Sequence, residues 1–276
     1  MNPSNACPIA DQLSQAIERN ELLLPSMPAW AAKAQRMLDD FNVTAAQIVV
    51  AVSSDPAFVA QLLKTANSAL YAGKPKVDNI NGAVSRLGYK MLRNLIVSAS
   101  MSKLLMIDKP VLKKHLAEFW DHSHEVAANC YVLAKSQKHL NPDYAMLAGL
   151  IHDIGRLPLL IFIENKSLPV DDAAMSAVIQ KCSALVSERL LQLWEFPSDL
   201  TEIPRAHEDI YRETESTRAS YADIVTVANM LTRATAKVVN WDNITAVKRI
   251  GLASDLYRDF FERFEKDLSA ARGMLS

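Results

Sequence analysis

The sequence predicts an all-α protein, and three observations carry this prediction. Apolar residues recur at helical spacing along most of the chain, and no run of useful length alternates with the period of two that marks a half-buried strand. Glycine is scarce, at 7 of 276 residues, whereas average usage would give roughly 19. Cap residues followed by proline mark several helix starts. A chain with so little glycine has few tight hairpins, so all-β folds are disfavoured.

The first clear helix start is Asp55 followed by Pro56. A carboxylate at this place accepts hydrogen bonds from the free amides of the first turn, and proline lacks the amide that would stay unpaired. We expect the helix to bury Phe58 and Leu62 on one face and to end at Gly73.

The same device recurs further along the chain. Asp108 and Pro110 begin a long helix, and the Asn-Pro-Asp sequence at 141–143 begins the next, with an acid in the first turn where the helix dipole favours it. Apolar residues at helical spacing predict two more helices over 224–231 and 256–268. These elements complete the all-α prediction.

The domain prediction is an N-terminal extension at 1–19, a helical N-terminal lobe at 20–108 and a second helical lobe at 109–276. The extension is expected to be loosely attached. The seam is placed at 107–110, where one apolar helix ends and another is capped. No Gly/Ser-rich or Pro-rich linker divides the chain, so we expect the two lobes to form one cooperative unit.

Charge is balanced over the whole chain but uneven along it. The formal net charge is −1, which argues against a dedicated nucleic-acid coat protein. Residues 60–106 contain seven basic side chains and one acidic side chain, whereas 164–223 contain twelve acidic and six basic side chains. These segments are expected to be solvated faces, with attraction between lobes or to partners as the alternative.

Targeting signals and cysteine usage both favour the cytoplasm. No stretch reaches about 18 consecutive apolar residues, and the first residues lack the basic and apolar regions of a signal peptide. We therefore expect a cytoplasmic protein that does not bind membranes. Cys7, Cys130 and Cys182 are odd in number and far apart, so they are expected to be reduced thiols.

The chemistry of the chain centres on histidine. The sequence contains no P-loop, no GxGxxG after a strand, no HExxH and no GxSxG, which removes the commonest nucleotide-binding and hydrolase classes. The segment His152-Asp153-Ile154-Gly155 follows the helix that begins near 142. Adjacent helical residues point about 100° apart, so His152 and Asp153 share a metal ion only if the ion lies over the helix edge between them.

A neighbouring helix would have to supply further ligands. His122 is the natural supplier, because two antiparallel helices with a short connection bring residues about 30 positions apart together, whereas His124 points to nearly the opposite side. Two imidazoles and a carboxylate suit a divalent transition metal. The alternative is a polar cluster in which Asp153 only orients His152 between packed helices.

Five parts of the chain resemble the bacterial HDOD domain, in the order typical of that family: 24–29, 55–58 with 62–71, 87–88 with 92–95, 119–123, and 150–155. The resemblance extends from about residue 20 to about residue 235. It implies an all-α unit in which a helical N-terminal lobe packs on a lobe similar to HD-superfamily phosphohydrolases. It also implies a regulatory or signalling protein without catalytic activity.

HD-superfamily phosphohydrolases bind divalent metal through a histidine, a later His-Asp pair and a final aspartate. The resemblance places the first three on His122, His152 and Asp153, and the last on Asn229. An amide oxygen is a weaker ligand than a carboxylate, and the charge of the ligand set falls from −2 to −1. No cofactor is therefore expected, with weak binding of a divalent metal as the alternative.

The related HD-GYP phosphodiesterases carry additional histidines. Here Cys182 stands in one matching stretch, and Ala206-His207 stands where a His-His pair is usual. The GYP motif itself is missing from the sequence. Cyclic dinucleotide hydrolysis is therefore not expected of this chain.

Three functions follow from these observations. The first is a non-catalytic cytoplasmic signalling module of the HDOD type, without catalytic residues, that acts through unidentified protein partners. The second is a metal-dependent phosphohydrolase whose metal site is degraded. The third is anion or nucleic-acid binding by the basic N-terminal lobe, where Arg86, Lys90 and Arg93 could share a face unless Gly88 breaks the helix between them.

Overall fold

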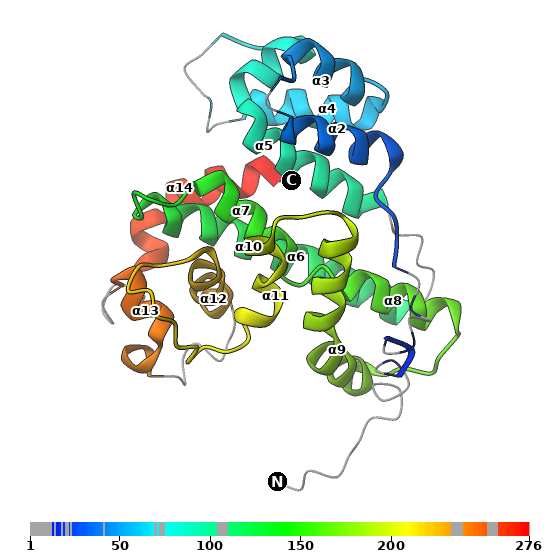
Figure 1. Ribbon diagram of the computed structural model, residues 1–276, viewed down its shortest axis with the longest axis vertical. Coiled ribbons are helices and arrows are strands. Elements are labelled where there is room, and N and C mark those ends of the chain that lie inside the picture. The colour runs from blue at the N-terminus through cyan, green and yellow to red at the C-terminus, as the bar shows by residue number, and fades with distance from the viewer. Residues whose placement is uncertain are drawn as a thin grey trace, which may run out of the picture.

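The computed structural model of the protein describes residues 13, 15–17, 19, 22, 24–40, 42–68, 71, 75–103, 110–232, 240–252 and 259–275. Every regular element within these residues is a helix, which confirms the predicted fold class (Figure 1). The elements are α2 (Ala29–Asp39), α3 (Ala45–Val52), α4 (Pro56–Ala66), α5 (Ile80–Lys103), α6 (Pro110–Lys135), α7 (Pro142–Ile151), α8 (Arg156–Asn165), α9 (Asp172–Leu193), α10 (Ser198–Thr201), α11 (Ile203–Ala206), α12 (Tyr221–Thr232), the 3-10 helix η3 (Trp241–Asn243), α13 (Thr245–Ile250) and α14 (Phe260–Leu275).

Helix α4 begins as predicted and ends earlier than predicted. The Asp55 carboxylate accepts hydrogen bonds from the backbone amides two and three residues further on, at 3.1 and 3.2 Å. The helix ends at Ala66 and not at Gly73, which lies outside the described residues. Asn67 stops it: its side chain accepts a bond from the amide of Val77 and donates one to the Val77 carbonyl, which ties this helix end to the chain before α5.

The other predicted helices are present with small shifts. Helix α6 begins at Pro110, and the expected cap Asp108 lies outside the described residues. Asn141 caps α7 by accepting a 3.0 Å hydrogen bond from the amide of Tyr144. Helix α12 covers the prediction at 224–231. Helix α14 begins at Phe260, so it covers the last prediction except for 256–259, of which 256–258 are not described.

The helices form two groups that share one apolar core. Helices α2 to α5 lie at one end of the molecule in Figure 1, α9, α12 and α13 lie at the other, and α6 and α7 run between them. Helix α5 packs on α7, and α14 packs on both α6 and α4. A single cluster of buried side chains extends from Ala31 in α2 to Ala271 in α14. The expectation of one cooperative unit stays a prediction, and the seam predicted at 107–110 falls outside the described residues except for Pro110.

A second core cluster lies between α8 and α9. It contains Leu13 and Ile17, which are both buried, and the backbone carbonyl of Ile17 accepts a hydrogen bond from Arg189 of α9. The described part of the extension is therefore packed against the second lobe. This packing differs from the loose attachment that the sequence suggested, because these two side chains form an apolar stripe.

Two glycines allow the helices around the His-Asp pair to approach closely. A Cβ atom on Gly149 would lie 2.8 Å from the Cα of Ala127 and 2.8 Å from the sulfur of Cys130, both in α6. A Cβ atom on Gly155 would overlap the backbone of Ser187 in α9, whose hydroxyl accepts a 2.7 Å hydrogen bond from the Gly155 amide. The His-Asp pair is therefore held between two tight helix contacts.

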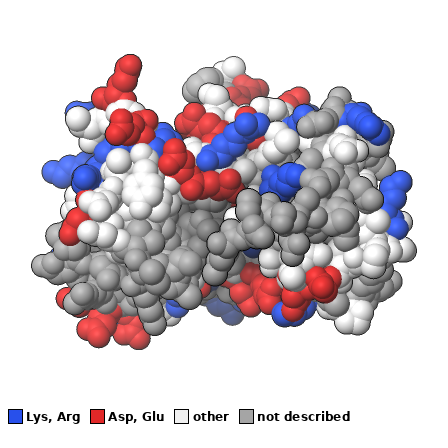
Figure 2. All heavy atoms as spheres, turned by 90° about the horizontal axis from the view of Figure 1, so that it is seen from below, with Lys and Arg blue, Asp and Glu red and all other residues white. Residues whose placement is uncertain are grey.

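In the basic N-terminal segment, two of the three candidate anion-binding side chains form bonds within the protein. Arg86 donates hydrogen bonds to the carbonyls of Ala66 and Pro75, and Arg93 forms an ion pair with Asp39. Helix α5 is broken at Gly88, where φ is 73°. Figure 2 shows the opposite end of the molecule, seen from below, where acidic and basic side chains are interspersed and give the described face no single sign of charge.

One buried carboxylate, that of Asp223, joins three segments of the second lobe. It forms a capping box with Ser220, with the Ser220 amide and hydroxyl donating at 2.8 and 2.9 Å. Arg212 and Arg249 both donate to it, Arg249 through two nitrogens at 2.6 and 3.0 Å. Burial alone would raise the pKa of Asp223, but these hydrogen bonds and the charge of Arg249 lower it.

One stretch, 142–165, is long and apolar enough by composition to cross a membrane, with a mean hydropathy of 1.7. It consists of α7 and α8, and 83% of its most apolar window is buried inside the protein. The stretch is therefore packed inside the protein as two core helices.

Candidate functional site: a histidine and aspartate cluster

The structure brings together the three residues that the sequence singled out. His122 projects from α6. His152 is the C-cap of α7, directly after the last helical residue, and Asp153 follows it. One potential ligand atom from each residue lies within 4.8 Å of the other two. Helices α6 and α7 are antiparallel neighbours, so the spacing argument placed His122 correctly.

His124 lies outside this cluster, as the helical angle requires. Its ring packs against Trp120, with 5.5 Å between ring centroids. Burial lowers the pKa of His124, and the charge of Asp121 opposes this shift. Its surroundings are those of a packed core histidine.

The backbone orients His152 more directly than Asp153 does. The Nδ1 atom lies 2.7 Å from the carbonyl oxygen of Gly149, so it is assigned as the N–H donor. In the neutral ring this bond leaves the lone pair on Nε2, which is buried, lies 3.4 Å from Asp153 Oδ2 and makes no hydrogen bond. Two electron-rich atoms therefore face each other unless a proton or a cation lies between them.

The side chain nearest to the Asp153 carboxylate is that of Arg156, a residue that the spacing argument did not include. The guanidinium of Arg156 donates to Asp153 Oδ2, and the Ser183 hydroxyl donates to Oδ1 at 3.4 Å. Burial opposes ionisation of Asp153 and would raise its pKa. With a proton on Nε2, His152 is an imidazolium whose charge and hydrogen bond, together with the charge of Arg156, outweigh burial and hold the pKa of Asp153 well below its usual range.

His207 is a fourth member of the cluster. Its ring meets that of His152 edge-on, with 5.0 Å between centroids, and its Nδ1 lies 3.0 Å from the carbonyl oxygen of Ile203. The side chain is almost fully buried. The only sequence signal for it was the position of Ala206-His207 in the HD-GYP resemblance, because 55 residues separate His207 from His152.

Asn229 reaches the same place from α12. It lies one turn before Thr232, whose hydroxyl donates to the Asn229 carbonyl at 2.7 Å and lies 3.3 Å from His122 Nδ1. The side-chain oxygen of Asn229 is buried and accepts no hydrogen bond from the residues that the structure describes. It therefore stands as an unsatisfied acceptor at the edge of the cluster.

A pocket of about 810 Å³ opens beside the cluster. Asp153, Arg156, His207 and Asn229 line it, together with Glu118 and Glu208. Among the described residues, neither His122 nor His152 contributes to this lining. The two imidazoles are thus set back from the opening, and the guanidinium of Arg156 is the cation at the pocket wall.

The donor set does not match a firmly held catalytic metal. His122, His152 and Asp153 converge well enough for three ligands, and the lone pair on His152 Nε2 is suited to one of them. However, the carboxylate of Asp153 is already bonded to Arg156, and Asn229 offers a neutral amide. The site therefore carries an internal cation next to its single carboxylate.

We expect Asp153→Ala to lower the free energy of unfolding by about 1 to 3 kcal/mol, because it removes the partner of a buried imidazole and of Arg156. Arg156 lines an open pocket, so water can compensate part of the loss. Urea denaturation measures the change. The control is Asp78→Ala, which changes an exposed aspartate. Asp171→Ala is unsuitable as a control, because Asp171 caps α9. A variant with unchanged stability would contradict the described packing.

The all-helical fold thus brings a histidine of one helix to a His-Asp pair at the end of the next, as the motifs predicted. The family model of the HDOD domain matches residues 24–210. The chain therefore belongs to the HDOD family, as its motifs suggested. The match includes the N-terminal helices and the His-Asp pair, whereas Asn229 lies beyond it.

Solved structures share the fold at low sequence identity. A Shewanella amazonensis SB2B protein named "Putative metal-dependent phosphohydrolase" superposes with a TM-score of 0.76 at 22% identity, over 98% of each chain. An HDOD domain protein with unknown function from Geobacter sulfurreducens gives 0.65 at 18% identity, over 100% of this chain and 99% of that chain. A "Putative signal transduction protein" from Marinobacter aquaeolei VT8 gives 0.67 at 21% identity, over 99% of this chain and 67% of that chain.

A relative known by sequence is an uncharacterized protein of Treponema pallidum (strain Nichols). It is 26% identical over an alignment of 228 residues, and the match covers 76% of this chain and 42% of the relative. The chain thus spans less than half the length of the curated relative that it matches.

Proposed function

We propose that this HDOD protein is a cytoplasmic regulatory module that acts through protein partners and catalyses no reaction. The observation that carries the proposal is the Asp153–Arg156 ion pair beside the amide of Asn229. A phosphohydrolase of this architecture needs a divalent cation at that carboxylate. Here a side chain of the protein supplies positive charge at the same oxygen, and the second carboxylate is missing.

Metal analysis and a hydrolysis assay test the non-catalytic part of the proposal. Protein purified without chelator or added metal is expected to contain clearly less than one metal ion per chain. With manganese, magnesium, iron or nickel, turnover of bis(p-nitrophenyl) phosphate and p-nitrophenyl phosphate should not exceed that of the His152→Ala variant. One metal ion per chain together with turnover that His152→Ala abolishes would contradict the proposal.

Affinity purification tests the partner. The same protein should be retained saturably by wild type and by His152→Ala, because partner binding does not use the buried cluster. Failure to retain any protein in a saturable manner would contradict action through partners. Retention by wild type alone, with the melting temperature of His152→Ala unchanged, would show that partner binding depends on the cluster.

A metal-dependent phosphohydrolase is the second candidate, and one observation favours it. His122, His152 and Asp153 place three potential ligand atoms within 4.8 Å, and His152 Nε2 makes no hydrogen bond. The name of the Shewanella protein with the same fold agrees with this candidate. A bound divalent ion would supply water activation and neutralise phosphate charge. The metal analysis above separates the two candidates.

A further inference from the structure

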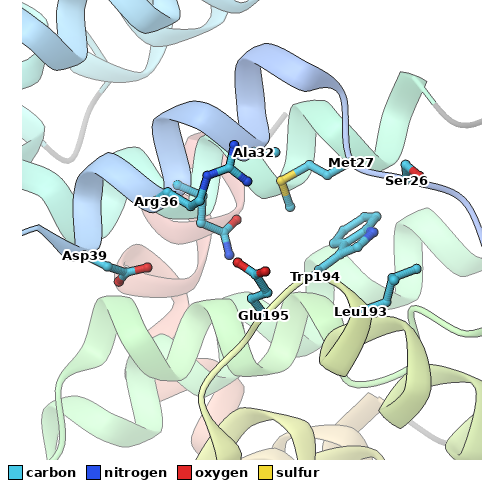
Figure 3. Close-up of a pocket in the computed structure, with 9 residues that line it drawn as sticks. Ser26, Met27, Ala32, Arg36, Asp39, Leu193, Trp194 and Glu195 are labelled. Atoms are coloured by element: carbon cyan, nitrogen blue, oxygen red, sulfur yellow. The ribbon is translucent and has the colours of Figure 1, made fainter.

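A second, smaller pocket lies between the N-terminal helix α2 and the end of α9, away from the histidine cluster. Its volume is about 200 Å³, below the roughly 300 to 1,000 Å³ that drug-sized ligands occupy. Figure 3 shows Arg36 of α2 and Glu195 on opposite sides of it, with Met27 and Trp194 to one side. The pocket is lined by charged, polar and apolar side chains, among them Met27, Gln35, Arg36, Leu193, Trp194 and Glu195.

One wall of this pocket holds a buried hydrogen-bond acceptor that is not used. Gln35 is only 5% exposed, and its side-chain oxygen accepts no hydrogen bond from the described residues. The oxygen atom itself has less than 1 Å² of exposed surface, so it lies behind the wall and a ligand in the pocket does not reach it. Recognition of a ligand therefore depends on the charged and apolar side chains of the pocket.

The pocket also carries one unpaired charge of each sign. Among the described residues, neither Arg36 nor Glu195 has an ion-pair partner within 4.0 Å. A third charged lining residue, Asp39, is neutralised by its ion pair with Arg93. A purely cationic ligand would meet Arg36, and a purely anionic ligand would meet Glu195, so the pair selects a ligand that carries both charges.

Apolar surface completes the pocket. Trp194 is held in place because its ring N–H donates a 3.0 Å hydrogen bond to the Pro25 carbonyl. Met27 lies next to it, and Leu193 at the rim is 53% exposed, which is high for a large apolar side chain. These side chains offer a fixed apolar surface beside the charged pair.

The backbone at Glu195 gives independent support. Glu195 lies two residues after the end of α9 and has a φ of 59°. The amide of the next residue, Phe196, donates a 3.0 Å hydrogen bond to the Leu191 carbonyl. Glycine is the residue that this helix-end geometry favours, because side chains are strained at positive φ. The carboxylate is therefore placed at the pocket in spite of the backbone preference.

We propose that this interlobe pocket binds a free α-amino acid with an apolar side chain. Its ammonium group would donate to Glu195, and its carboxylate would accept from Arg36. Its side chain would lie on Met27 and Trp194. This proposal does not rest on the proposed function, because it uses none of the residues of the histidine cluster.

Calorimetric titration of the full chain tests the proposal with L-leucine as the probe. We expect a dissociation constant between about 10 µM and 1 mM, as suits a ligand with so few atoms. N-acetyl-L-leucine, which lacks the ammonium charge, and L-leucinamide, which lacks the carboxylate, should each bind at least tenfold more weakly. L-Argininamide carries positive charge and no carboxylate. It should not displace L-leucine from the pocket.

Three variants locate the binding. Arg36→Gln and Glu195→Gly should each weaken L-leucine binding at least tenfold, and Lys33→Gln, an exposed change on the same helix, should not. Glu195→Gly should keep or raise the melting temperature, because glycine relieves the positive φ, so loss of binding in that variant cannot be a loss of fold.

Four outcomes would overturn the proposal. They are no binding of L-leucine at 10 mM, equal binding of L-leucine and both blocked forms, unchanged binding in Glu195→Gly, and tighter binding of L-argininamide than of L-leucine. The last would assign the pocket to a basic side chain of a partner protein.

Discussion

Asp223→Asn is expected to lower the free energy of unfolding by about 3 to 5 kcal/mol. The substitution removes the negative charge that Arg212 and Arg249 share and turns one acceptor oxygen into a donor that faces their guanidinium groups. It also breaks the capping box at the start of α12. Both arginines are mostly buried, so water replaces the lost contacts poorly.

Urea denaturation at several pH values measures this loss. Because the folded pKa of Asp223 is lowered, its contribution is fully present above the ordinary carboxyl pKa of about 3.9 and is lost as the pH falls through the lower folded value. Wild type and Asp223→Asn should therefore differ at pH 7 and converge in acid. Glu215→Gln, an exposed change in the nearby loop, serves as the control and should leave stability unchanged. A difference that is the same at pH 7 and in strong acid would show that the carboxylate charge is not the cause.

Asn229→Asp is expected to convert the histidine cluster into a metal site. The variant adds a second carboxylate at the pocket edge, so a divalent ion would face two negative charges, two imidazoles and the guanidinium of Arg156. We expect the affinity for manganese to rise at least tenfold over wild type. Without metal, the added buried charge should lower the melting temperature, and manganese should restore it.

Metal content and melting temperature with and without manganese measure this change. The double variant Asn229→Asp/His152→Ala is the matched control, and it should lose the gained metal while keeping the added carboxylate. If Asn229→Asp binds no more metal than wild type, the assignment of Asn229 to the metal position is wrong. Metal gain without turnover would identify the cluster as a former metal site in a regulatory protein.

Local signals predicted much of the fold because helix caps depend on residues close in sequence. Asp55 and Asn141 both bond to amides within three residues, so their helix starts could be found from the sequence. The end of α4 could not, because Asn67 is fixed by Val77, ten residues further on. Gly73 is the stronger local stop signal, and a contact made only in the folded chain overrides it.

The candidate site divides in the same way. His122, His152 and Asp153 could be brought together from the spacing of two adjacent helices. Arg156 was within reach of the same argument, because residues three apart share a helix face, and its role was missed. The Asp223–Arg249 pair and the place of His207 depend on how α11, α12 and α13 pack, and no local pattern specifies that packing.

The close helix contacts at Gly149 and Gly155 affect how mutational data on this protein are read. Even alanine has no room at either place, and the carbonyl of Gly149 also holds His152. A scan of all substitutions, scored only by the amount of folded protein, should therefore show the lowest tolerance around the His-Asp pair. Such intolerance is the usual mark of an active site, but here close packing is sufficient to produce it.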